Sequence, residues 1–181
     1  MKTKKLILSA LFTALIIVGS FIKIPFPVMP MTLQFAVVLL SGILLGPYLG
    51  LASVFIYILL GLTGLPVFAT GGGIGYVLIP SFGYVLGFLP AVFVAGVITK
   101  NKAATFNRLF VSSVTALAIT YFIGLVYFTL IKTLYLGETV NLWQLLYSQV
   151  LFMLPKDILL CLLCSFLGKR LQFIMAMDKF K

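Results

Sequence analysis

Charged residues are missing from a long stretch of this chain, and this restricts the folds open to it. No Asp, Glu, Lys or Arg lies between Lys23 and Lys100. Only 9% of the 181 residues are charged and 62% are hydrophobic, whereas a soluble domain carries roughly 25% charged residues. So few charges cannot cover a surface that faces water. The sequence therefore predicts an all-α integral membrane protein, with residues 1–181 forming one domain.

Breaks in the apolar runs predict six membrane-spanning helices, a number that fits the length at ~20 residues per span. A Pro-rich stretch at 24–30, a Gly-rich stretch at 66–80 and a polar break at 137–141 interrupt the runs. Pro155 suits the first turn of the last helix. The N-terminal run lacks a convincing cleavage site, so we interpret it as a helix and not a removed signal. The predicted helices cover about 4–24, 32–46, 48–65, 82–99, 106–135 and 155–173.

The positive charges predict an orientation in the bilayer. With six spans, all but three of the 13 Lys and Arg residues fall on the side of the two termini. Lys and Arg collect in short cytoplasmic loops, so both termini are predicted to be cytoplasmic. The Pro-rich and Gly-rich segments then meet on the outer side, where irregular backbone indicates a cavity. Because the net charge of +10 sits in these membrane flanks, nucleic-acid binding is not favoured.

Enzymatic chemistry is poorly supported by the residue inventory. The chain has no histidine and three acidic residues, which removes His-based catalysis and most metal sites. Glu138 lies in a loop and Asp178 in the tail, so Asp157 has no second carboxylate for a catalytic pair. Cys161 and Cys164 form a CxxC within an apolar run, which favours packing over redox activity. We predict that the protein is not an enzyme and that it binds no metal and no cofactor.

The adjacent Lys156 and Asp157, at the start of the last helix, are the main candidates for ligand recognition. A charge inside a membrane costs at least ~2.5 kcal/mol and usually faces a cavity or a partner. Asp157 is suited to accept hydrogen bonds from ligand N–H groups, and Lys156 to meet a carboxylate. The alternative is structural: Asp157 stabilises the helix dipole and Lys156 reaches the lipid headgroups.

Other polar and small residues are weaker candidates. Gln34 suits either a ligand anchor or a backbone partner, and Tyr76 and Tyr84 suit either a pocket wall or an interfacial belt. A glycine cluster fits either a loop that covers a pocket or a plain turn, and it lacks the context of a dinucleotide site. Small residues spaced by four predict close helix packing, with Ala10 and Ala14 alternatively facing a partner protein. These glycines are Gly71, Gly72, Gly73 and Gly75 in the cluster, and Gly42, Gly46, Gly50, Gly83 and Gly87 at the spacing of four.

Three segments together resemble a known family. They read MPMTLQFAVVLLSGILLGPYLG, then GLTGLPVFATGGGIGYVLIPSFGYVLGF, then LPKDILL. In this order they resemble BioY, the biotin-specific substrate-binding (S) component of energy-coupling-factor (ECF) transporters, over roughly residues 5–172. The resemblance implies a six-helix bundle in a prokaryotic cell membrane that captures biotin from outside. It also implies a transmembrane coupling protein and two cytoplasmic ATPases as partners, a toppling movement in the bilayer, and ATP use by those partners alone.

The resemblance implies roles for individual residues as well. Asp157 matches the acidic residue that binds the ureido ring of biotin. The other matches are Thr32 and Gln34 in the TLQ motif, Gly72, Gly73 and Gly75 in a loop that closes over the ligand, Ser81, Gly83 and Tyr84 in the motif that opens the fourth helix, and Ala10 and Ala14 on the face that docks on the coupling protein.

The chain departs from the family pattern near the expected ligand. Where the family often has Pro-Gly-Asp-Leu-Ile-Lys, Lys156 precedes the aspartate and Leu160 replaces the later lysine. Phe82 stands where a second glycine is common. Lipoate, which shares the sulfur ring and valerate tail of biotin but lacks ureido N–H groups, is therefore an alternative ligand. A membrane interaction protein without transport activity is the second alternative.

Overall fold

The described part of the chain is almost entirely helical. The computed structural model describes residues 2–24, 31–100, 105–139, 141–148 and 153–177. Its α-helices are α1 (Lys2–Phe21), α2 (Gln34–Leu45), α3 (Pro47–Leu62), α4 (Phe82–Thr99), α5 (Phe106–Leu130), α6 (Leu142–Ser148) and α7 (Leu154–Met177). A 3₁₀ helix, η1 (Ile74–Leu78), lies in the Gly-rich segment, and a π-helical turn, η2 (Ile131–Tyr135), extends α5.

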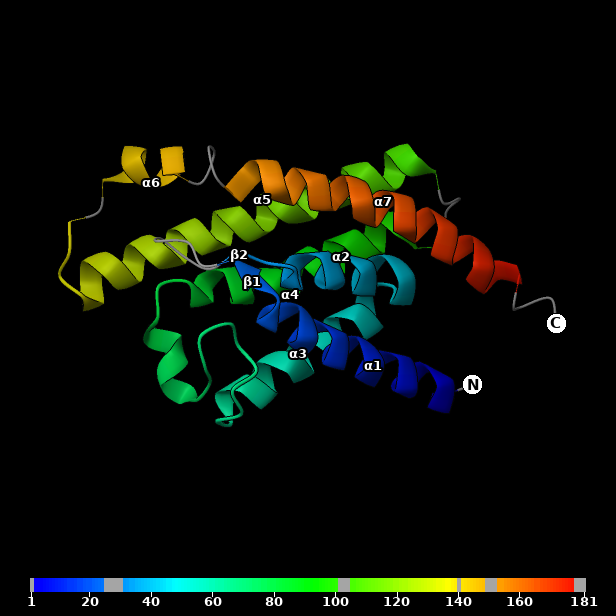
Figure 1. Cartoon of the computed structure of the whole chain (residues 1–181), viewed down its shortest axis with the longest axis horizontal. Helices are drawn as coiled ribbons and strands as arrows, with labels where there is room; N and C mark the ends of the chain where they lie inside the picture. The colour runs from blue at the N-terminus through cyan, green and yellow to red at the C-terminus, as the bar shows by residue number, and fades with distance from the viewer. Residues whose placement is uncertain (1, 25–30, 101–104, 140, 149–152, 178–181) are drawn as a thin grey trace.

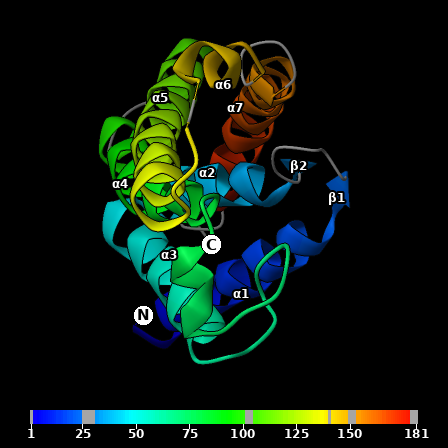
Figure 2. The same cartoon turned by 90° about the vertical axis from the view of Figure 1, so that its left-hand side faces the viewer.

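The long helices stack as three pairs. Figures 1 and 2 show α5 beside α7 on one side, α1 beside α3 on the other, and α2 with α4 between them. Contacts of α4 with α5 and α3, and of α2 with α1, α3 and α7, hold the layers together. The start of α1 and the end of α7 lie at the same end of the molecule (Figure 1). The loop around η1 and the short α6 lie at the opposite end.

The prediction of an all-helical membrane fold is confirmed, but the count of six spanning helices is not. Among the described residues, three helices are long and apolar enough to span a bilayer: Thr3–Phe21, Phe82–Thr99 and Phe106–Tyr135. The apolar α2 and α3 have 12 and 16 residues. α7 carries Lys156 and Asp157 in its first turn and Lys169 and Arg170 later on. The additional helix α6 was not predicted. Its buried Leu145 packs with Tyr84 and Phe128, while Trp143 is 83% exposed.

Two helix ends differ from prediction for local reasons. The first helix ends at Phe21, not at 24, because Lys23–Ile24 (β1) pairs antiparallel with Met31–Thr32 (β2). This two-residue ladder is a local addition to the helical fold. α3 ends at Leu62 because Gly64, with φ +106°, leaves the helical conformation.

Glycines on α2, α3 and α4 let these helices approach closely, as predicted. A methyl group at Gly42 would lie 2.6 Å from the carbonyl oxygen of Val92, and one at Gly87 would lie 3.0 Å from the backbone of Thr120. Gly46 is different, since it adopts φ +82° between α2 and α3 with nothing within 4 Å of an added methyl group. It is a turn residue, not a packing residue.

A buried polar seam joins α1 to α3. The hydroxyls of Ser9 and Ser53 lie 2.9 Å apart, and the Thr13 hydroxyl donates to the Ser53 carbonyl at 3.0 Å. All three residues are buried. In an apolar bundle such bonds set the rotation of one helix against its neighbour.

Ser53→Ala is expected to lower the free energy of unfolding by about 0.6 kcal/mol, with an upper bound of roughly 1.7 kcal/mol, because the Ser9 hydroxyl loses the Ser53 hydroxyl and keeps the longer bond to the Leu49 carbonyl, at 3.4 Å. Chemical unfolding in mixed micelles measures this loss. Thr115→Val is the control, since the Thr115 hydroxyl bonds to Val111 of its own helix. Equal losses in the two variants would contradict a specific role for the seam.

Candidate functional site

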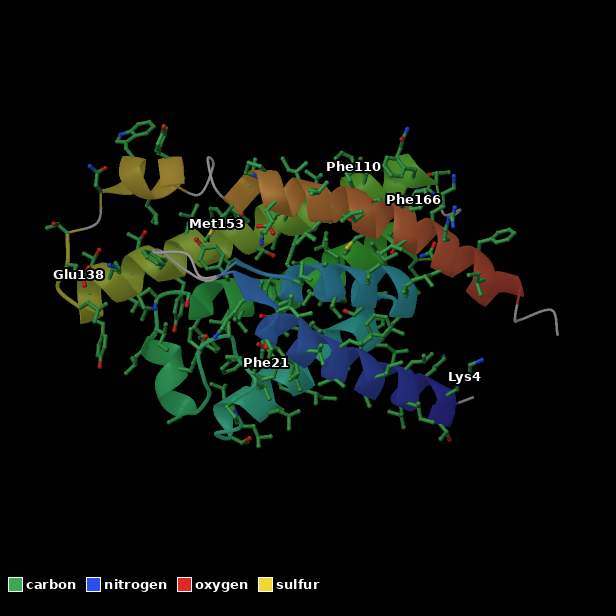
Figure 3. The ribbon with its side chains drawn as sticks, in the orientation of Figure 1. Lys4, Phe21, Phe110, Glu138, Met153 and Phe166 are labelled. Carbon is green, nitrogen blue, oxygen red and sulfur yellow. The ribbon has the colours of Figure 1, made fainter. Side chains whose placement is uncertain are left out.

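A cavity lies between α2, α4, α5 and α7. The empty space measures about 470 Å³ when the open solvent at its mouth is included. Figure 3 labels Met153, which contributes to this lining beside α5. The wall is mostly apolar with a few polar groups, the usual composition of a ligand pocket. The lining residues are Thr32, Phe35, Tyr84, Phe88, Leu117, Thr120, Tyr121, Met153, Lys156 and Asp157.

Asp157 is the acidic group of this cavity. Pro155 stands in the first turn of α7 and places Asp157 in the same turn, where the helix dipole stabilises a negative charge. The residue is only 6% exposed. Its Oδ2 accepts a hydrogen bond of 2.7 Å from the Tyr121 hydroxyl on α5. Packing of α5 against α7 thus brings the two side chains together.

Lys156 neutralises the carboxylate. Its Nζ lies 2.6 Å from Asp157 Oδ1 and donates to the carbonyl oxygen of Thr32 at 3.4 Å. The Asp157 Oδ1 atom is buried and has no hydrogen bond of suitable geometry within the described residues, so the 2.6 Å contact is an ion pair with poor hydrogen-bond alignment. A carboxylate oxygen can accept two hydrogen bonds. Oδ1 therefore keeps capacity for a donor from a ligand.

Four of the predicted ligand-binding residues share this cavity: Thr32, Tyr84, Lys156 and Asp157. The β1–β2 pairing places Thr32 just before the N-terminal end of α2, and Tyr84 lies in the first turn of α4. Lys156 meets Asp157 and Thr32, and these contacts favour the recognition hypothesis over a lysine that merely reaches the headgroups. Their roles toward a ligand stay predictions.

Gln34 and Ser81 do not line the cavity. Gln34 is 3% exposed, and a methyl group at Gly19 on α1 would lie 3.1 Å from its Cα. Its side-chain nitrogen has no hydrogen-bond partner of suitable geometry in the described part of the chain. Ser81 precedes α4 as its capping residue without a side-chain cap bond.

The Gly-rich loop is packed on the end of α3, away from α7 in both views (Figures 1 and 2). The Gly73 amide donates to the Gly61 carbonyl at 2.7 Å, and the Tyr76 hydroxyl lies 3.0 Å from that of Thr70. Gly72, Gly73, Gly75 and Tyr76 are absent from the cavity lining. Closure of this loop over a ligand stays a prediction, and it would require the loop to adopt a different arrangement.

Sequence reasoning missed Tyr121. It lies inside an uninterrupted apolar run, where a tyrosine gives no distinct signal. One clue was available, because a tyrosine hydroxyl far from both helix ends needs a polar partner. Tyr121 also lies one helical turn after Leu117, so the two side chains share a face of the helix.

The CxxC cysteines serve in packing, as predicted. Cys161 and Cys164 are free and buried, and both belong to the main apolar cluster. Among the described residues, no group of three or more His, Cys, Asp or Glu side chains is placed to hold a metal ion.

The predicted partner face lies on the outside of α1. Ala10 and Ala14 are exposed, whereas Ser9 and Thr13 on the other side of the helix are buried. Leu6 and Leu11, both more than half exposed, flank the alanines. Contact of this face with another protein stays a prediction.

Comparison with known proteins identifies relatives along almost the whole chain. A sequence profile described as the BioY family matches residues 1–176. The "Probable biotin transporter BioY" of Lysinibacillus sphaericus is 46% identical over 126 residues, which cover 69% of this chain and 64% of that protein. The match thus spans slightly less than two thirds of that relative. The "Biotin transporter BioY" of Lactococcus lactis subsp. cremoris is 32% identical over 94% of this chain and 92% of that protein.

A solved structure has the same fold. It is described as the crystal structure of the S-component for biotin from an ECF-type ABC transporter. It is 30% identical, with a TM-score of 0.77 over 94% of this chain and 92% of that chain. The shared fold therefore covers nearly the whole chain.

Proposed function

Because the chain belongs to the BioY family, we propose that it is the biotin-binding membrane subunit of an ECF transporter. The observation that carries the proposal is the buried Asp157 carboxylate in a mostly apolar cavity of a fold shared with the biotin S-component. A cyclic urea offers N–H donors to a carboxylate, and a thioether ring with a valerate tail suits apolar walls. The site therefore offers a partner for the polar ureido group of biotin and apolar walls for its sulfur ring and tail.

Biotin is favoured over lipoate. The named relatives are biotin transporters. With lipoate, Lys156 would either leave Oδ1 of Asp157 without a donor or stay at Oδ1 and lose its contact with the ligand carboxylate. An unsatisfied buried acceptor costs about 1–3 kcal/mol. We expect transport and not catalysis, since the family and the solved neighbour are transport components.

The finer features of the resemblance belong to the same proposal. They are the transmembrane coupling protein, two cytoplasmic ATPases that use the ATP, docking through Ala10 and Ala14, and toppling of the subunit to release its ligand inward. Both termini are proposed to be cytoplasmic, which agrees with the location of the start of α1 and the end of α7 at one end of the molecule (Figure 1).

Calorimetry on purified protein tests the function. The protein is produced in biotin-starved cells and titrated in detergent with biotin and with lipoate, while mass spectrometry identifies any co-purified small molecule. We expect nanomolar binding of biotin. Heat with lipoate alone would change the ligand, and heat with neither would overturn the proposal.

Lys156→Gln is expected to weaken biotin binding by roughly tenfold, which corresponds to ~1.4 kcal/mol. The reason is that Lys156 is the one cationic side chain in the cavity lining, and its flexible stem can turn from Asp157 to a ligand carboxylate. The neutral amide of biotin, which has no carboxylate, should lose less. Titrating both ligands into both proteins measures the difference.

Lys132→Gln is the matched control, because Lys132 pairs with Glu138 outside the cavity. It should bind both ligands like the natural protein. Equal losses of biotin and its amide in Lys156→Gln would show that Lys156 does not read the carboxylate.

A further inference from the structure

We propose that Tyr121 is a positioning residue that determines how Asp157 meets the ligand. The inference rests on the proposed function, since it names the group that orients the acid of that site. Tyr121 lies on α5 and Asp157 on α7, so the hydrogen bond between them joins the two helices.

The two oxygens of Asp157 have different kinds of partner. Oδ2 accepts a hydrogen bond of 2.7 Å from the Tyr121 hydroxyl. This donor sits on a rigid aromatic ring, whose side chain has few rotatable bonds. Oδ1 faces the Nζ of Lys156, an ammonium on a flexible four-carbon stem whose side chain is 26% exposed. Displacing Lys156 requires only side-chain rotation, whereas displacing Tyr121 requires movement of a packed ring. A ligand donor is thereby directed to Oδ1.

Tyr121 is itself held by the pocket wall. Its ring meets that of Tyr84 nearly at right angles, with 6.1 Å between ring centroids, a favoured aromatic geometry. Tyr84 in turn packs with Leu145 of α6. The chain of contacts from α6 through Tyr84 to Tyr121 fixes the carboxylate plane before a ligand arrives.

This arrangement selects for an N–H donor. In a cyclic urea the two N–H groups point away from each other, so one carboxylate receives one of them through one oxygen. Oδ2 already holds the Tyr121 hydroxyl on a packed ring, so the ligand donor meets the acid at Oδ1 when Lys156 turns away. A ligand without a donor would either leave Oδ1 unsatisfied or leave Lys156 in place and lose its contact with the carboxylate.

A double-mutant cycle tests the inference. Biotin dissociation constants are measured for the natural protein, Tyr121→Phe, Asp157→Asn and the double variant. Tyr121→Phe removes one oxygen and keeps the ring contact with Tyr84, so the fold should persist, and thermal unfolding of each protein checks this. We expect Tyr121→Phe to weaken biotin binding about tenfold. The double variant should bind about as weakly as Asp157→Asn, because Tyr121 acts through Asp157.

Tyr135→Phe is the control, since Tyr135 lies in η2, on the same helical rod as Tyr121, and is 58% exposed. It should bind biotin like the natural protein. Unchanged affinity in Tyr121→Phe, or additive losses in the double variant, would overturn the positioning role. Failure of the natural protein to bind biotin would instead overturn the proposed function.

Discussion

Asp157→Asn is expected to weaken biotin binding by about 1–3 kcal/mol, roughly 5- to 150-fold. The variant keeps the volume of the side chain but removes its charge and replaces an acceptor by an amide N–H₂. That group would face a ligand N–H, and Lys156 would lose its 2.6 Å ion pair. Calorimetric titration measures the change.

Glu138→Gln is the control for the loss of an acid, because Glu138 is exposed and pairs with Lys132. Its affinity for biotin should match that of the natural protein. Unchanged affinity in Asp157→Asn would remove Asp157 from the binding site.

Gly61→Ala is expected to destabilise the protein by about 1–3 kcal/mol, the usual effect of overpacking. An added methyl group would lie 2.0 Å from Cζ of Phe68. That ring is 1% exposed. It meets Tyr57 edge-on at 5.4 Å between centroids and packs in a tilted arrangement against Tyr76 at 4.4 Å. Either the ring leaves its place or α3 shifts, and both release the Gly-rich loop.

The free energy of unfolding in mixed micelles measures this effect. Gly75→Ala makes the same chemical change in the Gly-rich loop that packs on α3, at a position where nothing lies within 4 Å of an added methyl group. The stability of this variant should be unaffected. Phe68→Leu combined with Gly61→Ala should lose less than the sum of the two single changes. Additive losses would contradict the contact as the cause.

The helical class and several helix ends were predictable from the sequence. The fourth helix occupies Phe82–Thr99 as predicted, and the prediction for 106–135 corresponds to α5 together with η2. These elements are bounded by charges or by irregular residues, which a linear reading detects. Lys156 and Asp157 were identifiable as candidates, because a charge in an apolar run usually faces a cavity or a partner, but their ion pair with each other was not predicted.

The inward faces of the helices were not predictable in the same way. Lipid-facing positions are as apolar as the interior, so hydrophobic periodicity does not tell which side of α5 carries a cavity. Tyr121 was missed and Gln34 was placed at a site it does not line for this reason. The position of the Gly-rich loop depends on Phe68 filling the space above Gly61, a contact between residues that no local pattern connects.

The charges of Lys156 and Asp157 sum to zero, and this has an energetic consequence for transport. An empty site that crosses the bilayer as proposed does no work against the membrane potential through these two groups. Biotin adds one negative charge, so its inward passage opposes a negative-inside potential by about 2.3 kcal/mol per 100 mV, if it crosses the full field. The loaded step would then depend on voltage while the return of the empty site would not, and the ATP used by the partners would have to supply this electrical work.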